Sequence, residues 1–396
     1  MGRPRAPCTA LREPLESNEG AMNLEFSDQQ LQLKNEARRF LQDKCPPQAV
    51  RAILEGAAPF DRALWKSLGE MGFLGVVIPE AYGGMGAGYL ELCVVAEEMG
   101  RVLAPVPFSS SVFLASEFLM LAGSPSQKRA YLPRLASGET IGTFAFVEGQ
   151  GQVTPQAIRT TVTGDRLTGT KIPVPDGDVA DFAVVAARTG TGADEQSISL
   201  FLVDLNTDGI TRTTVDTVDP TRRHAQIDFA NAAAEALGPS GEGWSIISRV
   251  FDRAAVLTAF EQVGGADRAL EMGRDYALER MAFGRPIGSF QAIKHMLADM
   301  YVQATLARSN AYYGAWALST EAAELPQAAA TARVSATQAF LHCAKNNIQV
   351  HGGMGFTWAF DCHLYYRRAN LLALSLGGLS QWERLLISRL RRRNAA

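Results

Sequence analysis

The strongest constraint on the fold is a stretch of strand-like sequence, residues 139–236, that separates two long helical regions. Before it, apolar residues recur at helical spacing from Ser27 onward, where Ser27 and Gln30 form a capping-box pattern. Within it, short apolar and β-branched runs alternate with turns that contain Gly or Asp. After it, Ala- and Leu-rich helical patterns cover roughly 246–279, 290–318, 326–352 and 365–390. This order predicts an α+β chain of three parts, the last of which is a helical bundle.

Residues 280–291 interrupt the second helical region at a point rich in groups that bind phosphate and flat rings. A Gly and a Pro break the helix between Phe283 and Ser289, and Ser289 is expected to cap the next helix. Arg280 offers a guanidinium for phosphate, Phe283 a planar face and Gln291 a polar edge. An ordinary corner between two helices with a surface arginine explains these twelve residues equally well.

Four segments, taken in chain order, identify a known family. They read GFLGVVIPEAYGG at 72–84, LGPSGEGW at 237–244, RMAFGRPIGSFQ at 280–291 and QVHGGMGF at 349–356. Together they resemble the FAD-dependent acyl-CoA dehydrogenase family. The resemblance implies an N-terminal helical domain, a middle β-barrel-like domain and a C-terminal four-helix bundle. The corresponding boundaries are 1–21 for a disordered extension, 22–137 for the N-terminal domain, 138–238 for the β-domain and 239–396 for the bundle.

The resemblance also implies contacts to FAD, which in this family lies between the β-domain and the bundle. Its adenine dinucleotide end is held by a neighbouring subunit. The implied cofactor-binding residues are Arg280, Phe283, Gln291, Gln349, Gly352 and Gly353. Arg280, Gln349 and the two glycines would serve the pyrophosphate, where small residues let backbone N–H groups approach closely. For the glycines, a turn that ends a helix is the alternative interpretation.

The family reaction removes a proton next to an acyl-CoA thioester and passes a hydride from the following carbon to flavin, with electron-transferring flavoprotein as the implied acceptor. Most members carry the base in a Tyr-Glu-Gly-Thr segment, and counting without gaps places Leu376 there. A second base position used by some relatives falls on Ala254, so neither residue can accept a proton. Losing a positioned base typically lowers a rate by ~10²–10⁴-fold. Asp252, Glu261 and Glu148 are weak replacement candidates and are expected to be solvated or ion-paired carboxylates.

The β-region departs from the family as well. Residues 147–154 read VEGQGQVT where the family has Thr-Glu-Pro-Gly-Ala-Gly-Ser-Asp. The segment 173–175 reads Pro-Val-Pro where a Trp-Ile-Thr or Trp-Ile-Ser normally contacts the isoalloxazine. Proline offers neither a side-chain donor nor a backbone N–H, so these ring contacts are lost or reworked. The adjacent residues Arg222 and Arg223 could face a phosphate, but they are expected to form a surface pair on the β-domain.

These departures resemble the subgroup whose subunits form hetero-oligomers, lack the usual catalytic Glu and act on bulky thioesters such as steroid side chains. The leading hypothesis is an FAD-dependent subunit for α,β-dehydrogenation of an acyl-CoA, with a related partner chain that supplies the base and the ring contacts. A homo-oligomer, dimer or tetramer, with a relocated base is the second hypothesis. A non-catalytic structural subunit and a flavin-dependent hydroxylase are the remaining alternatives.

Bulk properties exclude other classes. The net charge of −3 gives no reason to expect nucleic acid as a partner. The five cysteines form no CxxC pair, which favours a reduced, cytoplasmic protein over a disulfide framework. No apolar run approaches the ~18 residues of a membrane span. His351 and His363 lack neighbouring ligands of metal-binding type, so no metal is expected.

Overall fold

The computed structural model describes residues 26–190 and 192–395, and the side chains of 393–395 lie outside that description. The extension expected at 1–21 and Cys8 also lie outside the described residues. The N-terminal part is helical, as predicted, and the capping box at Ser27 is confirmed by reciprocal bonds between Ser27 and Gln30. Its helices are α1 (Asp28–Lys44), α2 (Pro47–Leu54), α3 (Arg62–Glu70), α4 (Tyr89–Arg101), the π-helix η2 (Ser109–Ala115), α5 (Ser116–Ala122) and α6 (Pro125–Ala136).

The middle part is a single sheet of short strands. They are β1 (Gly142–Ala145), β2 (Thr161–Thr163), β3 (Arg166–Pro175), β4 (Phe182–Arg188), β5 (Ile198–Asp204), β6 (Ile210–Val215), β7 (His224–Ala233) and β8 (Glu235–Leu237). The strands pair in the order β6-β7-β3-β2-β4-β5-β8, and β1 pairs with β4. This path is open at β6 and β8, so the middle part is barrel-like only in a loose sense. Strands β4 and β5 are buried along nearly their whole length, which explains their continuous apolar sequence.

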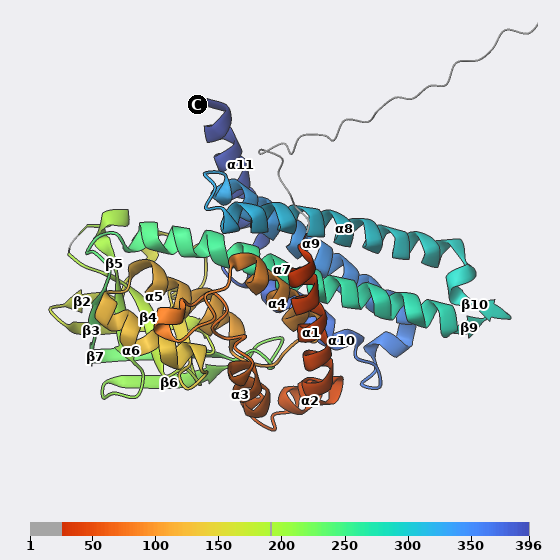
Figure 1. Ribbon diagram of the computed structural model, residues 1–396, viewed down its shortest axis with the longest axis horizontal. Coiled ribbons are helices and arrows are strands. Elements are labelled where there is room, and N and C mark those ends of the chain that lie inside the picture. Colours follow the sequence, from red (N-terminus) through yellow and green to blue (C-terminus); the bar gives the residue numbers. More distant parts are fainter. Residues whose placement is uncertain (1–25, 191, 396) are drawn as a thin grey trace, which may run out of the picture.

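The C-terminal part is a bundle of long helices. They are α7 (Gly243–Glu279), α8 (Gln291–Ser319), α9 (Leu325–His351), α10 (Cys362–Leu374) and α11 (Leu379–Ala395). Figure 1 shows α7 beginning beside the sheet and ending at the hairpin of β9 (Met281–Ala282) and β10 (Arg285–Pro286), at the far end of the molecule. Glycines allow α4 and α7 to cross closely, because a Cβ on Gly264 would lie 1.9 Å from the Glu97 carbonyl oxygen. A Cβ on Gly100 would likewise lie 1.9 Å from the Glu261 carbonyl oxygen.

The helix predicted over 365–390 is wrong as one element, because residues 375–378 divide it into α10 and α11. Leu376 and Gly377 have φ values of 59° and 99°, which no α-helix accommodates. The indole N–H of Trp382 donates to the Leu376 carbonyl at 3.1 Å and fixes the start of α11 against this turn.

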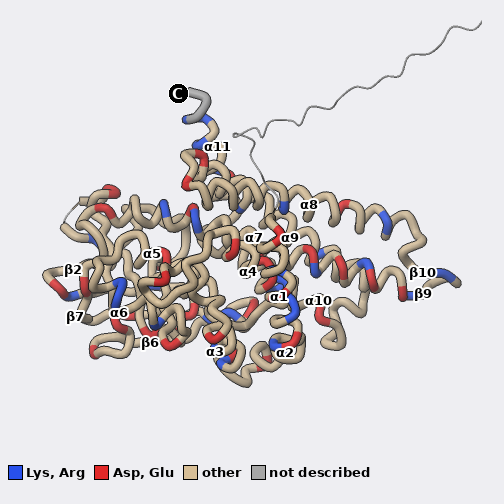
Figure 2. Tube along the Cα trace, in the orientation of Figure 1, with Lys and Arg blue, Asp and Glu red and all other residues tan. Residues whose placement is uncertain are grey.

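No helix in the described chain is long and apolar enough to cross a membrane. Basic and acidic residues are interspersed along the described elements in Figure 2, apart from the arginines that gather near the end of α11. Cys45, Cys93, Cys343 and Cys362 are buried and free.

Candidate functional site

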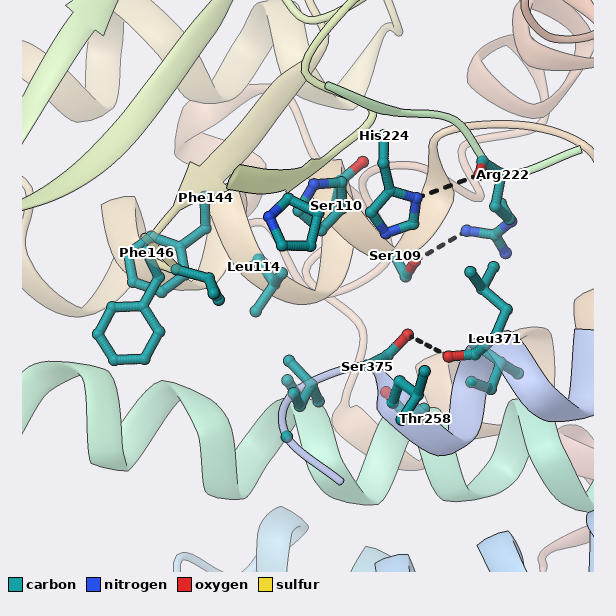
Figure 3. A pocket seen from close by; sticks show the side chains of 18 of the residues that line it. Ser109, Ser110, Leu114, Phe144, Phe146, Arg222, His224, Thr258, Leu371 and Ser375 are labelled. Atoms are coloured by element: carbon teal, nitrogen blue, oxygen red, sulfur yellow. Dashed lines mark hydrogen bonds between the residues drawn. The ribbon is translucent and has the colours of Figure 1, made fainter. Parts of the chain in front are cut away.

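A cavity of about 620 Å³ lies where the sheet, the π-helix η2 and the C-terminal bundle meet (Figure 3). Both positions at which the family resemblance places a base, Leu376 and Ala254, line this cavity. Pro173 and Pro175, from the segment where the family contacts the flavin ring, line it too. The structure therefore brings these four residues together around one space, although they come from three separate segments of the chain.

The turn at 375–378 is held in place by a buried arginine. Arg333 on α9 is 1% exposed and donates to the carbonyl oxygens of Leu372 and Ser375, the latter at 2.6 Å. Leu376 has a left-handed backbone, which costs a non-glycine residue roughly 1–2 kcal/mol. Within the described chain the Leu376 N–H finds no hydrogen-bond acceptor. The turn thus leaves a backbone donor free beside the cavity while its side chain carries no acid or base.

Two of the three acids suggested by the sequence lie on α7 but do not line the cavity. Asp252 forms an ion pair with Arg389 at 2.8 Å, and burial raises the pKa of its carboxyl to about 6 despite that partner. Glu261 is 1% exposed and accepts from Arg222 at 2.6 Å. Both carboxylates are occupied by arginine.

The third acid, Glu148, also lies outside the cavity lining and stabilises the β-region. It accepts from the backbone N–H groups of Arg159 and Thr160 and forms an ion pair with the buried Lys171 at 2.7 Å. Burial alone would raise the pKa of Glu148, but Lys171 and the hydrogen bonds outweigh it and hold that pKa below its ordinary value.

The cavity contains a polar wall that the sequence did not reveal. Asp176 is 4% exposed and accepts from the Ser110 hydroxyl at 2.6 Å. Burial raises the pKa of the Asp176 carboxyl, against the opposing effect of Arg222. Beside it, Arg222 donates to the Ser109 hydroxyl at 2.8 Å, and the Nδ1 atom of His224 lies 3.3 Å from the Arg222 carbonyl oxygen (Figure 3).

The surface position expected for Arg222 is wrong, because this side chain is buried and paired with Glu261. Its neighbour Arg223 is only partly exposed and pairs with Asp178 at 2.7 Å. Strands β3 and β7 pair antiparallel with Pro175 opposite His224. This register places Asp176, which follows β3, beside Arg222 and Arg223, which precede β7. A turn-forming Pro-Asp-Gly at 175–177 was the available signal, but the register could not be read from it.

A second group of site residues lies at the far end of the bundle. The strands β9 (Met281–Ala282) and β10 (Arg285–Pro286) form a hairpin, and its turn residues Phe283 and Gly284 have φ values of 53° and 78°. This turn leaves the Phe283 side chain 95% exposed. Arg280, directly after α7, and Gln291, at the start of α8, are exposed as well.

Ser289 does not cap α8, as the sequence had suggested. It belongs to the short 3₁₀ turn η5 (Ile287–Ser289) and donates to the Pro286 carbonyl at 2.7 Å. Phe290 is the N-cap instead, and it makes no side-chain capping bond.

Ring stacking brings the two predicted cofactor segments to the same end of the bundle. Tyr276 on α7 stacks on His351 at the end of α9, with ring centroids 4.1 Å apart. Arg280 follows Tyr276 by one helical turn, and the 3₁₀ segment η6 (Gly352–Phe356) follows His351 directly. Gln349, Gly352 and Gly353 are exposed, and a Cβ built on either glycine meets no atom within 4 Å.

The exposed end of the bundle fits one half of an FAD molecule. A guanidinium without a side-chain partner in the described chain and two open glycine backbones suit a diphosphate. None of these residues lines the cavity, so this end of the bundle and the cavity are separate places on the chain. At the cavity, the prolines offer no N–H to a flavin ring, so the ring half fits the family pattern poorly.

The comparisons with known proteins agree with this architecture. Residues 27–139 match the description "Acyl-CoA dehydrogenase, N-terminal domain", and residues 241–390 match "Acyl-CoA dehydrogenase, C-terminal domain". The chain is similar to acyl-CoA dehydrogenase IpdE2 of Mycobacterium tuberculosis, with 35% identity over 82% of this chain and 85% of the relative.

Among solved structures, the chain is similar to the ChsE4–ChsE5 complex from Mycobacterium tuberculosis. The TM-score is 0.83 with 29% identity, and the match covers 94% of this chain and 99% of the matched chain of the complex. It is also similar to a variant of the Tcur3481–Tcur3483 steroid ACAD, with a TM-score of 0.83 and 30% identity over 93% and 99% of the two chains.

Proposed function

The chain belongs to the acyl-CoA dehydrogenase family, and from that premise we propose that it is one subunit of a hetero-oligomeric flavoprotein that oxidises a bulky acyl-CoA thioester. Members of the family are FAD-dependent oxidoreductases that act on CH–CH bonds. The proposal concerns how this member divides that task with a partner chain.

The observation that carries the proposal is that neither of the two family base positions, both of which line the cavity, holds an acid or a base. Leu376 and Ala254 face the space in which the thioester would bind, and neither can take a proton. The three alternative acids are held by Arg389, Arg222 and Lys171 outside the cavity lining. In such a complex, a partner chain that carries a carboxylate at the equivalent of residue 376 supplies the base. The thioester is then oxidised in the partner's site.

In the proposed complex this chain binds and orients FAD from the outside. Bound FAD supplies the hydride acceptor for the reaction. Arg280 and Gln349 would bind its pyrophosphate, the backbone of Gly352 and Gly353 would approach the same group, and Phe283 would pack on the ring of a flavin seated in the partner. The exposure of these side chains supports this assignment, because Phe283 makes only an edge contact with Phe290 and the Arg280 guanidinium has no side-chain partner in the described chain.

The similarity to the ChsE4–ChsE5 complex and to a steroid ACAD supports both the hetero-oligomer and the bulky substrate. Electron-transferring flavoprotein remains the proposed acceptor of the electrons. The four free buried cysteines favour a reducing compartment, such as the cytoplasm.

Co-expression tests the proposal. The chain purified alone is expected to hold little flavin, whereas the chain purified with a related subunit that retains the family Glu is expected to hold FAD and to oxidise bulky acyl-CoA thioesters. A yellow solitary chain that turns over acyl-CoA at ordinary rates would contradict the proposal. Flavin bound only by the partner, with unchanged activity when this chain is omitted, would favour the structural-subunit alternative.

A further inference from the structure

The segment that carries Gly352 and Gly353 has no packing of its own at these two residues. A Cβ built on either glycine meets no atom within 4 Å, and Gly352 has a φ of 58°. Glycine backbones have more conformational freedom than those of other residues. If the backbone N–H groups of these glycines are to reach a diphosphate, contacts on either side must fix the segment.

Aromatic rings supply such contacts on both sides of the glycines. Before them, the His351 ring stacks on the Tyr276 ring, with centroids 4.1 Å apart and planes inclined by 23°. After them, the Phe360 ring packs edge-on against Tyr276 at 5.7 Å and against His351 at 5.4 Å. Edge-on and offset stacked rings stabilise each other beyond the area that they bury. The three rings come from the end of α7, the end of α9 and the segment before α10.

Tyr276 is also connected to Arg280, one helical turn further along α7. The Arg280 N–H donates to the Tyr276 carbonyl at 2.8 Å, and the Ile287 N–H donates to the Arg280 carbonyl at 2.8 Å. The short turn η5 packs closely on the same helical turn, because a Cβ on Gly288 would lie 2.9 Å from the Ala277 carbonyl oxygen. Tyr276 therefore contacts both the backbone of Arg280 and the rings that flank the glycines.

The ring stack offers no charge to a diphosphate. His351 is 6% exposed, and its Nδ1 atom lies 2.8 Å from the Asn347 carbonyl oxygen. Burial lowers the pKa of the His351 ring, against the opposing effect of this hydrogen bond. The ring is therefore neutral at pH 7, and the effect of the stack on a bound diphosphate has to be geometric.

We propose that Tyr276 is a positioning residue for FAD, whose ring contacts fix the spacing between Arg280 and the backbone of Gly352 and Gly353. This role rests on the proposed function and adds a residue that does not itself touch the cofactor. A guanidinium and backbone N–H groups held at one spacing bind a diphosphate more tightly than the same groups on segments that move independently. The reason is that the entropic cost of ordering the segments is then not met on binding.

Titration of the apo hetero-oligomer with FAD, and with ADP as a probe of the diphosphate end alone, tests this role. Tyr276→Leu removes the ring but keeps a residue of high helix propensity, so α7 should stay intact. We expect it to raise the dissociation constants of both ligands by ~5-fold or more. Tyr276→Phe keeps the ring, and among the described residues the Tyr276 hydroxyl has no hydrogen-bond partner. In Tyr276→Phe both constants should therefore stay within about twofold.

A double-mutant cycle separates positioning from a simple loss of stability. The factor by which Arg280→Ala raises the FAD dissociation constant should be ~3-fold or more smaller in Tyr276→Leu than in the parent chain, because the guanidinium is no longer held at the right spacing. The matched control is Tyr312→Leu on α8, which removes a ring stacked on Phe260 at 5.8 Å, away from the residues predicted to bind FAD. This control should lower the temperature of thermal unfolding without changing FAD affinity. Phe360→Leu, which removes another ring of the stack, replaces Tyr276→Leu in the cycle if that variant does not fold.

The outcomes separate this role from the proposed function. Unchanged binding of FAD and ADP after loss of the ring, or effects that simply add to those of Arg280→Ala, overturns the role of Tyr276 and leaves the hetero-oligomer intact. An equal loss of affinity in Tyr276→Phe overturns it as well, since the hydroxyl would then contact the ligand. An equal loss in Tyr312→Leu would show a general effect of stability, and a loss for FAD without a loss for ADP would show an effect on the flavin ring; both also overturn it. If the parent complex binds no FAD, or if Arg280→Ala leaves its affinity unchanged, the proposed function fails together with the role of Tyr276.

Discussion

Replacing Arg280 by alanine should weaken FAD binding by the hetero-oligomer without affecting the fold of this chain. The Arg280 side chain is exposed, and its only hydrogen bonds in the described structure run through its backbone, to Tyr276 and from Ile287. Its removal therefore costs the isolated chain almost nothing. In the complex, a charge-assisted bond to pyrophosphate is typically worth about 1.5–3 kcal/mol, which corresponds to a roughly 10- to 150-fold rise in the FAD dissociation constant.

The assay is titration of the apo-complex with FAD, followed by flavin fluorescence, together with thermal unfolding of this chain without cofactor. Arg280→Lys should recover part of the affinity, because lysine keeps the charge but loses the planar fork. The matched control is Arg274→Ala on the same helix, since Arg274 is also exposed and, among the described residues, pairs only with its neighbour Asp275. A dissociation constant for Arg280→Ala within about twofold of the unchanged complex would refute the assignment of Arg280 to the dinucleotide.

Three further substitutions test other residues of the chain. Gly353→Ala should leave thermal unfolding unchanged, because the new Cβ meets no atom within 4 Å, yet it should weaken FAD binding in the same titration by obstructing the backbone. Glu261→Ala should destabilise the chain by about 3–5 kcal/mol in urea unfolding, because Arg222 and Arg368 lose their shared buried partner; unchanged stability with lost turnover would instead identify Glu261 as the base. Asp252 has a native pKa of about 6, above the ~3.9 of an unfolded chain, so the native state holds its proton more tightly and stability should fall by about 2–3 kcal/mol as pH rises from about 4 to about 6. In Asp252→Asn that part of the pH dependence should vanish, and urea unfolding at pH 4.5 and pH 7 would show whether it does.

The sequence predicted the parts of the fold that depend on local patterns. The capping box at Ser27 needed only two side chains three residues apart, and the helical and strand-like periods gave the three-part order. The division of the last helix was missed, although Gly377 and Gly378 are turn signals, because apolar periodicity continues on both sides of them.

The polar wall could not be predicted because it depends on pairing between distant segments. Asp176 and His224 meet through the register of β3 and β7, and Arg222 is buried because it pairs with Glu261 on α7, 39 residues further along the chain. In the amino-acid sequence, Arg222 next to Arg223 has the pattern of an ordinary solvated pair. The polar wall is therefore visible only in the tertiary structure.

Anaerobic reduction of flavin in the purified hetero-oligomer by a bulky acyl-CoA thioester tests whether the partner chain supplies the base. We expect rapid bleaching of the flavin, which slows by ~10²-fold or more when the partner's Glu at the family base position is changed to Gln. Substitution of Asp252, Glu261 or Glu148 of this chain should not slow the bleaching to a comparable extent, once the effect of each substitution on stability is corrected for. If the bleaching rate does not depend on the partner's Glu, or if this chain alone bleaches its flavin, the partner does not supply the base.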